Sequence, residues 1–247
     1  MSRSLRTAAA ALTVTACLAA VTSCGSGSSG SPGASGSSGP PRAQPLTEAD
    51  LRSVLPSGES LRGFVAKPDV PSATETPPAI SASKSSPLYP DSPKACRALV
   101  DFELDRVQHR PAASVRADMT PRGREGQATD FSKLNSVRLS SYSVKEASAV
   151  LDSLRQALPS CDQFGVYALI YGDQDARINI GPWSAPDAGD DAVAFTWTVS
   201  GIAMDQTVPL TVVRTGGVLT TYSGAVPADI PRQQHEKVRA LIAGGSE

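Results

Sequence analysis

The chain has 247 residues, with 23 Lys and Arg, 24 Asp and Glu, 2 His and 4 Cys. The formal net charge of −1 excludes the basic excess that drives binding to nucleic acid or acidic lipid, and so few His and Cys leave little material for a metal cluster. With 20 Gly and 20 Pro, the composition fits one domain with unstructured appendages.

The N-terminus has the pattern of a bacterial lipoprotein signal peptide. Two Arg precede an uncharged run over residues 7–23, which is too short and too rich in Thr and Ser for a membrane-spanning helix. The run ends in Val21 and two small residues before Cys24, which resembles a lipobox. We therefore expect a cleaved signal peptide over residues 1–23 and acylation, including palmitate, at Cys24. An ordinary secreted protein that is cut elsewhere in this region is the alternative.

A tether is predicted between the lipid and the folded domain. Residues 25–41 consist of Gly, Ser, Pro and one Ala, so they cannot bury enough surface to order themselves. We expect residues 24–45 to be flexible and residues 46–247 to form a single extracytoplasmic domain. A Pro-rich stretch at about residues 67–93 is expected to be a surface loop of that domain.

The four cysteines divide between three roles. Cys17 lies in the predicted signal peptide and Cys24 is the predicted lipid attachment site, so we expect Cys96 and Cys161 to remain in an oxidising compartment. One disulfide is the economical interpretation. A redox or metal-binding pair is the alternative, although no C-x-x-C spacing accompanies them.

Helices and strands alternate in the first half of the domain. Thr47 and Asp50 form a capping-box pattern before an apolar stripe that Pro56 ends. The elements predicted here, in chain order, are a helix over about 48–55, a strand over 61–66, a helix between Pro93 and Pro111, and strands over 113–119 and 131–142.

The second half begins with a helix and then changes to the two-residue period of strands. Ser143 and Glu146 form a capping box, and apolar residues follow at helical spacing until Pro159. The elements predicted here are a helix over 144–158, strands over 166–171, 177–181, 192–200, 207–215 and 218–222, and a helix over 229–243. Runs of strands between helices predict an α+β fold, with an antiparallel sheet, helices packed around it and one disulfide.

Alternation within the strands predicts a polar sheet face. In the strand over 192–200, large apolar residues alternate with Ala, Thr and Ser, so one side is core. We place six polar residues on the opposite side as candidates for lining a ligand groove: Arg138, Ser140, Arg177, Asn179, Thr196 and Thr198. Plain solvent exposure is the alternative. Trp183, in a turn, is either a lid over the core, which we favour, or a binding contact.

Catalytic and metal motifs are weak. Ser81 and Lys84 match S-x-x-K, but they lie in the Pro-rich stretch without the partner motifs of penicillin-interacting enzymes. His109 and His235 are expected to be solvated. Five carboxylates in turns are candidate Ca²⁺ ligands, with solvated side chains as the alternative: Asp173, Asp175, Asp187, Asp190 and Asp191. We expect no catalytic residue, metal or cofactor.

A family resemblance covers about residues 46–243. Its motifs are Leu46-Thr47-x-Ala49-Asp50-Leu51, Leu55-Pro56, Gly63-Phe64, Cys96, Leu154-Arg155-x-x-Leu158-x-x-Cys161-Asp162-x-Phe164, Gly189-Asp190-Asp191-Ala192 and Val213-Arg214-x-Gly216-x-Val218-Leu219. This order resembles the PknH-like extracellular sensor-domain family of actinobacteria. The resemblance implies an antiparallel sheet with helices around a ligand cleft. The kinase sensor has two disulfides, whereas only the pair of Cys96 and Cys161 is available here, and the chain lacks a kinase segment.

The sequence therefore predicts a non-catalytic, ligand-binding or sensor-type lipoprotein on the outer face of the cell membrane. Its expected partner is an unidentified small ligand or a membrane protein, with no nucleic acid and with membrane contact only through the lipid. The alternative is an envelope scaffold that binds another membrane protein through a flat surface.

Overall fold

A computed structural model describes residues 44–69, 88–103, 109–123, 135–167, 175–200 and 206–244, all within the compact unit Gly39–Glu247. The predicted signal peptide, Cys24 and most of the tether lie outside these residues. So do residues 70–87 of the predicted Pro-rich loop. Among the described residues, no helix is both long enough and apolar enough to cross a membrane.

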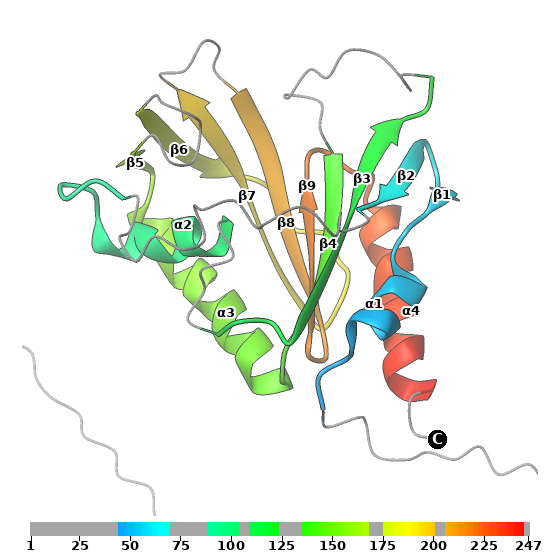
Figure 1. Cartoon of the computed structure of the whole chain (residues 1–247). Helices are drawn as coiled ribbons and strands as arrows, with labels where there is room; N and C mark the ends of the chain where they lie inside the picture. Colours follow the sequence, from blue (N-terminus) through cyan, green and yellow to red (C-terminus); the bar gives the residue numbers. More distant parts are fainter. Residues whose placement is uncertain are drawn as a thin grey trace, which may run out of the picture. The chain divides into compact units, whose positions relative to one another are not determined.

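The described residues form an α+β fold with one nine-stranded sheet (Figure 1). In chain order the elements are α1 (Glu48–Val54), β1 (Gly58–Leu61), β2 (Phe64–Pro68), the 3₁₀ helix η2 (Lys94–Cys96), α2 (Arg97–Glu103), β3 (Ala113–Pro121), β4 (Asn135–Ser141), α3 (Val144–Ala157), the 3₁₀ helix η4 (Leu158–Ser160), β5 (Gln163–Val166), β6 (Ala176–Pro182), β7 (Asp191–Ser200), β8 (Gln206–Thr215), β9 (Val218–Ser223) and α4 (Asp229–Gly244).

All neighbouring strands are antiparallel, in the order β1-β2-β3-β4-β9-β8-β7-β6-β5. Two meanders, β1 to β4 and β5 to β9, join where β4 pairs with β9. The predicted antiparallel sheet is confirmed, and this central pairing brings together residues that are far apart in the sequence.

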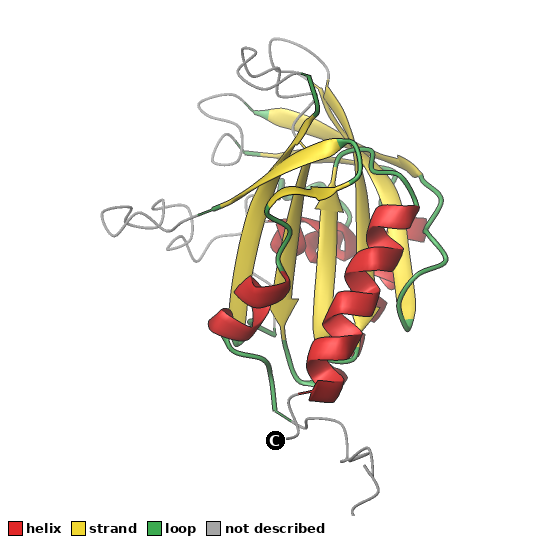
Figure 2. Cartoon of the chain, turned by 90° about the vertical axis from the view of Figure 1, so that its right-hand side faces the viewer, coloured by secondary structure: helices red, strands yellow, loops and turns green. Residues whose placement is uncertain are grey.

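Two hydrophobic cores lie on opposite faces of the sheet. The face that we call the α3 face carries Val193, Phe195, Trp197 and Val199 of β7, which pack in one cluster with residues of α2 and α3. The opposite face, the α4 face, carries Val115, Ala117 and Met119 of β3, which cluster with residues of α1 and α4. Figure 2 looks at the sheet from the side of α1 and α4, with the other helices behind it.

The two cores also lie at opposite ends of the sheet. The α3-face core uses β5 to β8, whereas the α4-face core uses β1 to β4, and the central strands β8 and β9 contribute to both. In β8, Val212 belongs to one core and Val213 to the other. Val218 to Tyr222 of β9 are all buried for the same reason. Polar side chains therefore occupy the α3 face of the strands near β1 and the α4 face of the strands near β5.

Local signals start the helices where the sequence predicts. The Ser143 hydroxyl accepts from the Glu146 N–H at 3.3 Å, and the Glu146 carboxylate accepts from the Ser143 N–H at 3.2 Å. Thr47 and Asp50 form the same reciprocal box at the start of α1. Both capping boxes are confirmed, and each satisfies backbone donors that a helix start leaves unpaired.

Two strand predictions are wrong in detail. The predicted strand over 61–66 is a hairpin of β1 and β2, because Gly63 has a φ of +82° and turns the chain. The predicted strand over 166–171 begins too late: β5 starts at Gln163, directly after the disulfide, and ends at Val166. Residues 168–171 lie outside the described part of the chain.

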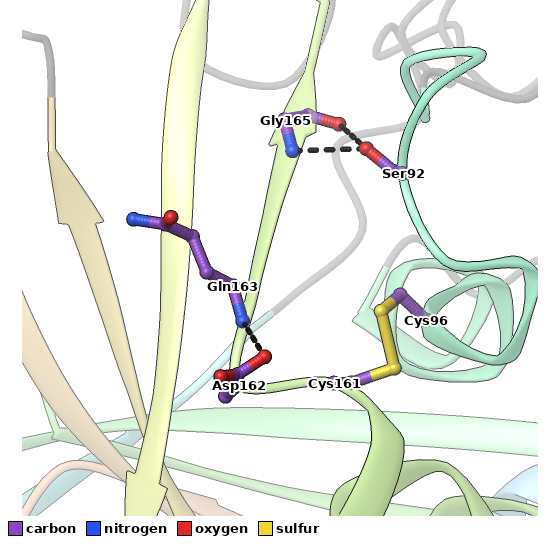
Figure 3. Close-up of a disulfide and its surroundings, with 6 residues drawn as sticks. All are labelled: Ser92, Cys96, Cys161, Asp162, Gln163 and Gly165. Carbon is purple, nitrogen blue, oxygen red and sulfur yellow. Dashed lines mark hydrogen bonds between the residues drawn. A yellow bond between two sulfur atoms is a disulfide. The ribbon is translucent and has the colours of Figure 1, made fainter.

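The predicted disulfide between Cys96 and Cys161 is present, with their Cα atoms 5.3 Å apart (Figure 3). Both cysteines are fully buried in the α3-face core. The bond joins the start of α2 to the segment between η4 and β5. It thereby fixes the edge of the sheet at which β5 lies.

Candidate ligand-binding site

The six residues that the sequence places on one polar face lie on two different faces. Arg177, Asn179, Thr196 and Thr198 share the α4 face, because the strands pair Asn179 with Thr198. Arg138 pairs with Thr221 and therefore lies on the α3 face, as does Ser140. The predicted grouping is wrong for Arg138 and Ser140, because β4 directs its apolar residues toward α4 whereas β7 directs them toward α3.

Arg138 packs against α2 rather than joining the other candidates. Its guanidinium carbon lies 5.4 Å from the centre of the Phe102 ring, within the range of a cation–π contact. One of its nitrogens donates to the Phe102 carbonyl at 3.5 Å. These contacts give Arg138 a structural role between β4 and α2.

The remaining candidates belong to a band of polar residues on the α4 face of β5 to β8, all neutral except Arg177. We call this band the polar strip; it consists of Gln163, Arg177, Asn179, Thr196, Thr198, Ser200 and Thr207. All of its side chains are half-buried or exposed. In β5 to β8 the apolar side chains point to the α3 face, so the alternating positions on the α4 face carry the polar side chains.

Side-chain hydrogen bonds hold the polar strip in place. The amide of Gln163 donates to the Asn179 amide oxygen at 2.9 Å, and Asn179 in turn reaches the Ser200 hydroxyl at 3.5 Å. The hydroxyls of Thr198 and Thr207 are 2.9 Å apart on the neighbouring pair of strands. These cross-strand bonds pre-orient polar groups that keep further hydrogen-bonding capacity.

A pair of tyrosines borders the polar strip at the β5 edge. Tyr89 and Tyr167 have ring centres 4.5 Å apart, and Tyr167 is 42% exposed. The Tyr89 ring lies over Gly165, on the face to which the neighbouring Arg177 points. A hydrogen bond to the Asp175 carboxylate raises the pKa of Tyr89 to about 12.

Ser92 holds the segment that carries Tyr89 against β5. Its hydroxyl accepts from the Gly165 N–H at 3.1 Å and lies 3.3 Å from the Gly165 carbonyl oxygen (Figure 3). The Tyr89 N–H also donates to the Gly165 carbonyl at 3.0 Å. The edge of β5 is thus paired, and the position of the tyrosine ring is fixed.

Trp183 borders the polar strip at its other end. It is 46% exposed and lines a hollow of about 290 Å³, together with Pro186, Thr211 and Pro231 at the start of α4. Thr211 lies on the α4 face, where it pairs with Ala194, so the hollow continues the strip. The exposed ring of Trp183 beside this hollow is accessible to a ligand, and the favoured interpretation of Trp183 as a lid over the core stays a prediction.

The loop that carries Trp183 is held at its far end by Asp190. The Asp190 carboxylate accepts from the Gly216 N–H at 2.6 Å and lies 3.6 Å from both Arg214 and Arg239. These contacts tie the loop to the β8–β9 turn and to α4. One wall of the hollow is therefore fixed to the core rather than left to a free loop.

Two further glycines shape this region. A Cβ at Gly181 would meet the Thr196 hydroxyl oxygen at 2.5 Å, so the absence of a side chain lets Thr196 lie over β6. Gly189 has a φ of +82°, which allows the loop to turn into β7.

Sequence reasoning missed Tyr89, Tyr167 and Gln163. Tyr89 lies in the Pro-rich stretch that was expected to be a plain loop, and Tyr167 and Gln163 lie around a strand whose start was misplaced. The signal that was present is Gly165, because a glycine inside a strand often marks a close approach by another part of the chain.

The histidines and one of the candidate Ca²⁺ ligands contact other side chains of the domain. His235 is not simply solvated: its Nδ1 lies 2.7 Å from the hydroxyl of buried Thr215, which joins α4 to β8. His109 lies 3.8 Å from Glu146. Asp191 pairs with Arg155 at 2.7 Å. In the described part of the chain, no three His, Cys, Asp or Glu residues are grouped as metal ligands, while Asp173, Ser81 and Lys84 lie outside it.

A larger hollow of about 570 Å³ lies between α2 and α3. Arg97 and Asp101 on its wall are paired with each other at 3.4 Å. Its described lining contains no Tyr, Trp or Phe. The polar strip is the stronger candidate, because it combines exposed aromatic rings with pre-oriented polar groups.

No protein-family model matches the sequence, and no curated protein matches it. Among solved structures, the chain is similar to the extracellular domain of PknH from Mycobacterium tuberculosis, with a TM-score of 0.48 and 11% sequence identity over 82% of this chain and 100% of that chain. The predicted membership in the PknH-like sensor family remains a prediction.

Proposed function

We propose that the protein is a lipid-anchored extracytoplasmic domain that binds a ligand on the polar strip and catalyses no reaction. The observation that carries this proposal is the strip itself: hydrogen-bonded polar side chains on a rigid sheet, with exposed Tyr167 at one end and exposed Trp183 beside a hollow at the other. Polar groups that are fixed next to exposed aromatic rings are typical of binding sites.

The two histidines do not supply a base on the polar strip. The chain has 2 His, and neither belongs to the polar strip. His235 faces a threonine hydroxyl that is only 2% exposed, so this pair offers no accessible nucleophile.

The exposed apolar residues favour a ligand site over an envelope scaffold. Large exposed hydrophobic side chains in the described part of the chain are Val144, Tyr167 and Trp183, and two of these border the polar strip. A scaffold surface would be expected to present a continuous apolar patch instead.

The anchor is tested by Cys24→Ala. Two or more acyl chains give stable membrane attachment, so the unmodified chain should fractionate with membranes and the variant should be released into the medium. Retention of Cys24→Ala in the membrane fraction would refute the lipoprotein proposal.

Ligand binding is tested by a thermal-shift screen of the full chain against envelope sugars, lipids, peptides and metabolites. A ligand at a hundred times its Kd stabilises the folded state by about 2.7 kcal/mol, which gives a clear rise in Tm. Arg177→Ala should reduce the shift. The matched control is Arg116→Ala, on the α3 face with a 52% exposed side chain, which should leave the shift unchanged. If both variants changed the ligand-induced Tm shift equally, the ligand would not bind at the polar strip. A screen in which no compound raises the Tm would contradict the binding function.

A further inference from the structure

We infer that the ligand of the polar strip is a carbohydrate chain. This inference rests on the proposed function and adds the chemical class of the ligand. It is carried by three features of the strip: aromatic rings at both ends, paired neutral polar groups between them, and a low density of charge.

The aromatic rings supply the first feature. Tyr167 is 42% exposed at the β5 edge, and Trp183 is 46% exposed beside the hollow. One face of a sugar ring carries C–H groups, which pack against a flat aromatic ring, while the hydroxyls point sideways to polar partners. Two aromatic borders with polar groups between them therefore match a ligand whose units have one apolar face and a polar rim.

The polar groups supply the second feature. In the pair of Thr198 and Thr207, one hydroxyl donates to the other, so one O–H donor remains for a ligand. The Gln163 amide uses one N–H on Asn179 and keeps a second N–H and its oxygen. Donors and acceptors thus lie side by side, as a row of sugar hydroxyls requires.

Charge supplies the third feature and separates carbohydrate from anionic ligands. Arg177 is the one charged member of the strip. The carboxylate of nearby Asp175 accepts a hydrogen bond from the Tyr89 hydroxyl. A nucleic acid or a polyphosphate calls for several cations. The Arg177 guanidinium carries N–H donors in a planar fork, and the hydroxyl oxygens of a sugar can accept from them.

The length of the strip indicates a chain rather than a single sugar. Arg177 and Pro182 are the second and last residues of β6, so at about 3.4 Å per residue they lie about 17 Å apart. This distance exceeds the width of one sugar ring. An oligosaccharide that contacts Tyr167 and Trp183 together should bind more tightly than its monosaccharide.

The inference is tested by probing a printed array of neutral and acidic oligosaccharides with the fluorescently labelled full chain. The Kd of the strongest binder is then measured by calorimetry. Trp183→Ala and Tyr167→Ala should each weaken binding about fivefold or more, and Trp183→Phe should restore most of the affinity. Val144→Ala, at a 53% exposed position on α3, is the matched control and should leave the Kd unchanged.

Tryptophan emission reports the site directly. Trp197 is only 4% exposed, so iodide should quench mainly Trp183, and the bound oligosaccharide should protect Trp183 from quenching. Binding without this protection would overturn the placement of the sugar. An array without binders would overturn the carbohydrate class. In that case, a non-carbohydrate ligand that binds Arg177→Ala more weakly than the unmodified chain would still support the proposed function. If no ligand of any class bound, both the proposed function and the carbohydrate inference would be wrong.

Discussion

The ring of Tyr89 occupies the space that a side chain at Gly165 would fill. A Cβ at this glycine would collide with several atoms of the ring. The contact closes the edge of β5 and sets the tyrosine beside Arg177. A segment far from β5 in the sequence therefore completes one end of the polar strip.

Gly165→Ala should displace the Tyr89 ring and lower the free energy of unfolding by about 1–3 kcal/mol, as overpacking does in cores. Urea unfolding measures the change. The control is Gly244→Ala at the end of α4, where an added Cβ meets nothing within 4 Å. If Gly165→Ala were as stable as this control, the contact with Tyr89 would not constrain β5.

Removal of the disulfide should destabilise the domain without changing its fold. The bond closes a loop with a sequence separation of 65 residues. The double variant Cys96→Ala and Cys161→Ala should therefore lose about 2–4 kcal/mol of unfolding free energy. Dithiothreitol should lower the Tm of the unmodified chain and leave that of the double variant unchanged; an unmodified chain that is insensitive to reductant would contradict the bond.

Glu146 should make α3 sensitive to acid. Hydrogen bonds from the Ser143 hydroxyl and N–H lower the pKa of Glu146 below its usual 4.5. A lowered pKa in the folded state adds stability that is present above pH 4.5 and is lost as the pH falls through the folded-state pKa. Glu146→Gln should therefore be less stable than the unmodified chain at pH 7, and the two should converge at lower pH.

Ser143→Ala separates this effect from a general loss of the helix cap. It removes the largest cause of the lowered pKa, so the pH dependence that Glu146 contributes should shrink. Unfolding curves at several pH values measure both variants. Parallel stability profiles for the unmodified chain and Glu146→Gln over the whole range would contradict the role of the carboxylate.

Tyr222→Phe should stabilise the domain. The hydroxyl of Tyr222 is buried in the central strand β9 and has no hydrogen-bond partner among the described residues. Its removal should raise the free energy of unfolding by about 1 kcal/mol, because an unpaired buried hydroxyl is costly. Thermal unfolding monitored by circular dichroism checks this, and a lower Tm for the variant would reveal a partner for the hydroxyl.

Much of the local structure was predictable because its causes are local. The capping box of Ser143 and Glu146 starts α3, and alternation marks β7 and β8 almost to the residue. The disulfide was predictable because two cysteines remained once the predicted signal peptide and the predicted lipid anchor had each been assigned one. The hairpin at Gly63 and the start of β5 were missed, since short strands with few apolar residues give little periodic signal.

The sequence by itself determined which residues within one strand share a side, because successive side chains alternate. Only the tertiary structure decided which side of each strand faces which core. β4 and β7 bury their apolar residues on opposite faces of the same sheet, so Arg138 and Thr198 are separated although their strand patterns look alike. The aromatic ends of the polar strip were decided in the same way, because Tyr89 reaches Gly165 through a contact that no local pattern encodes.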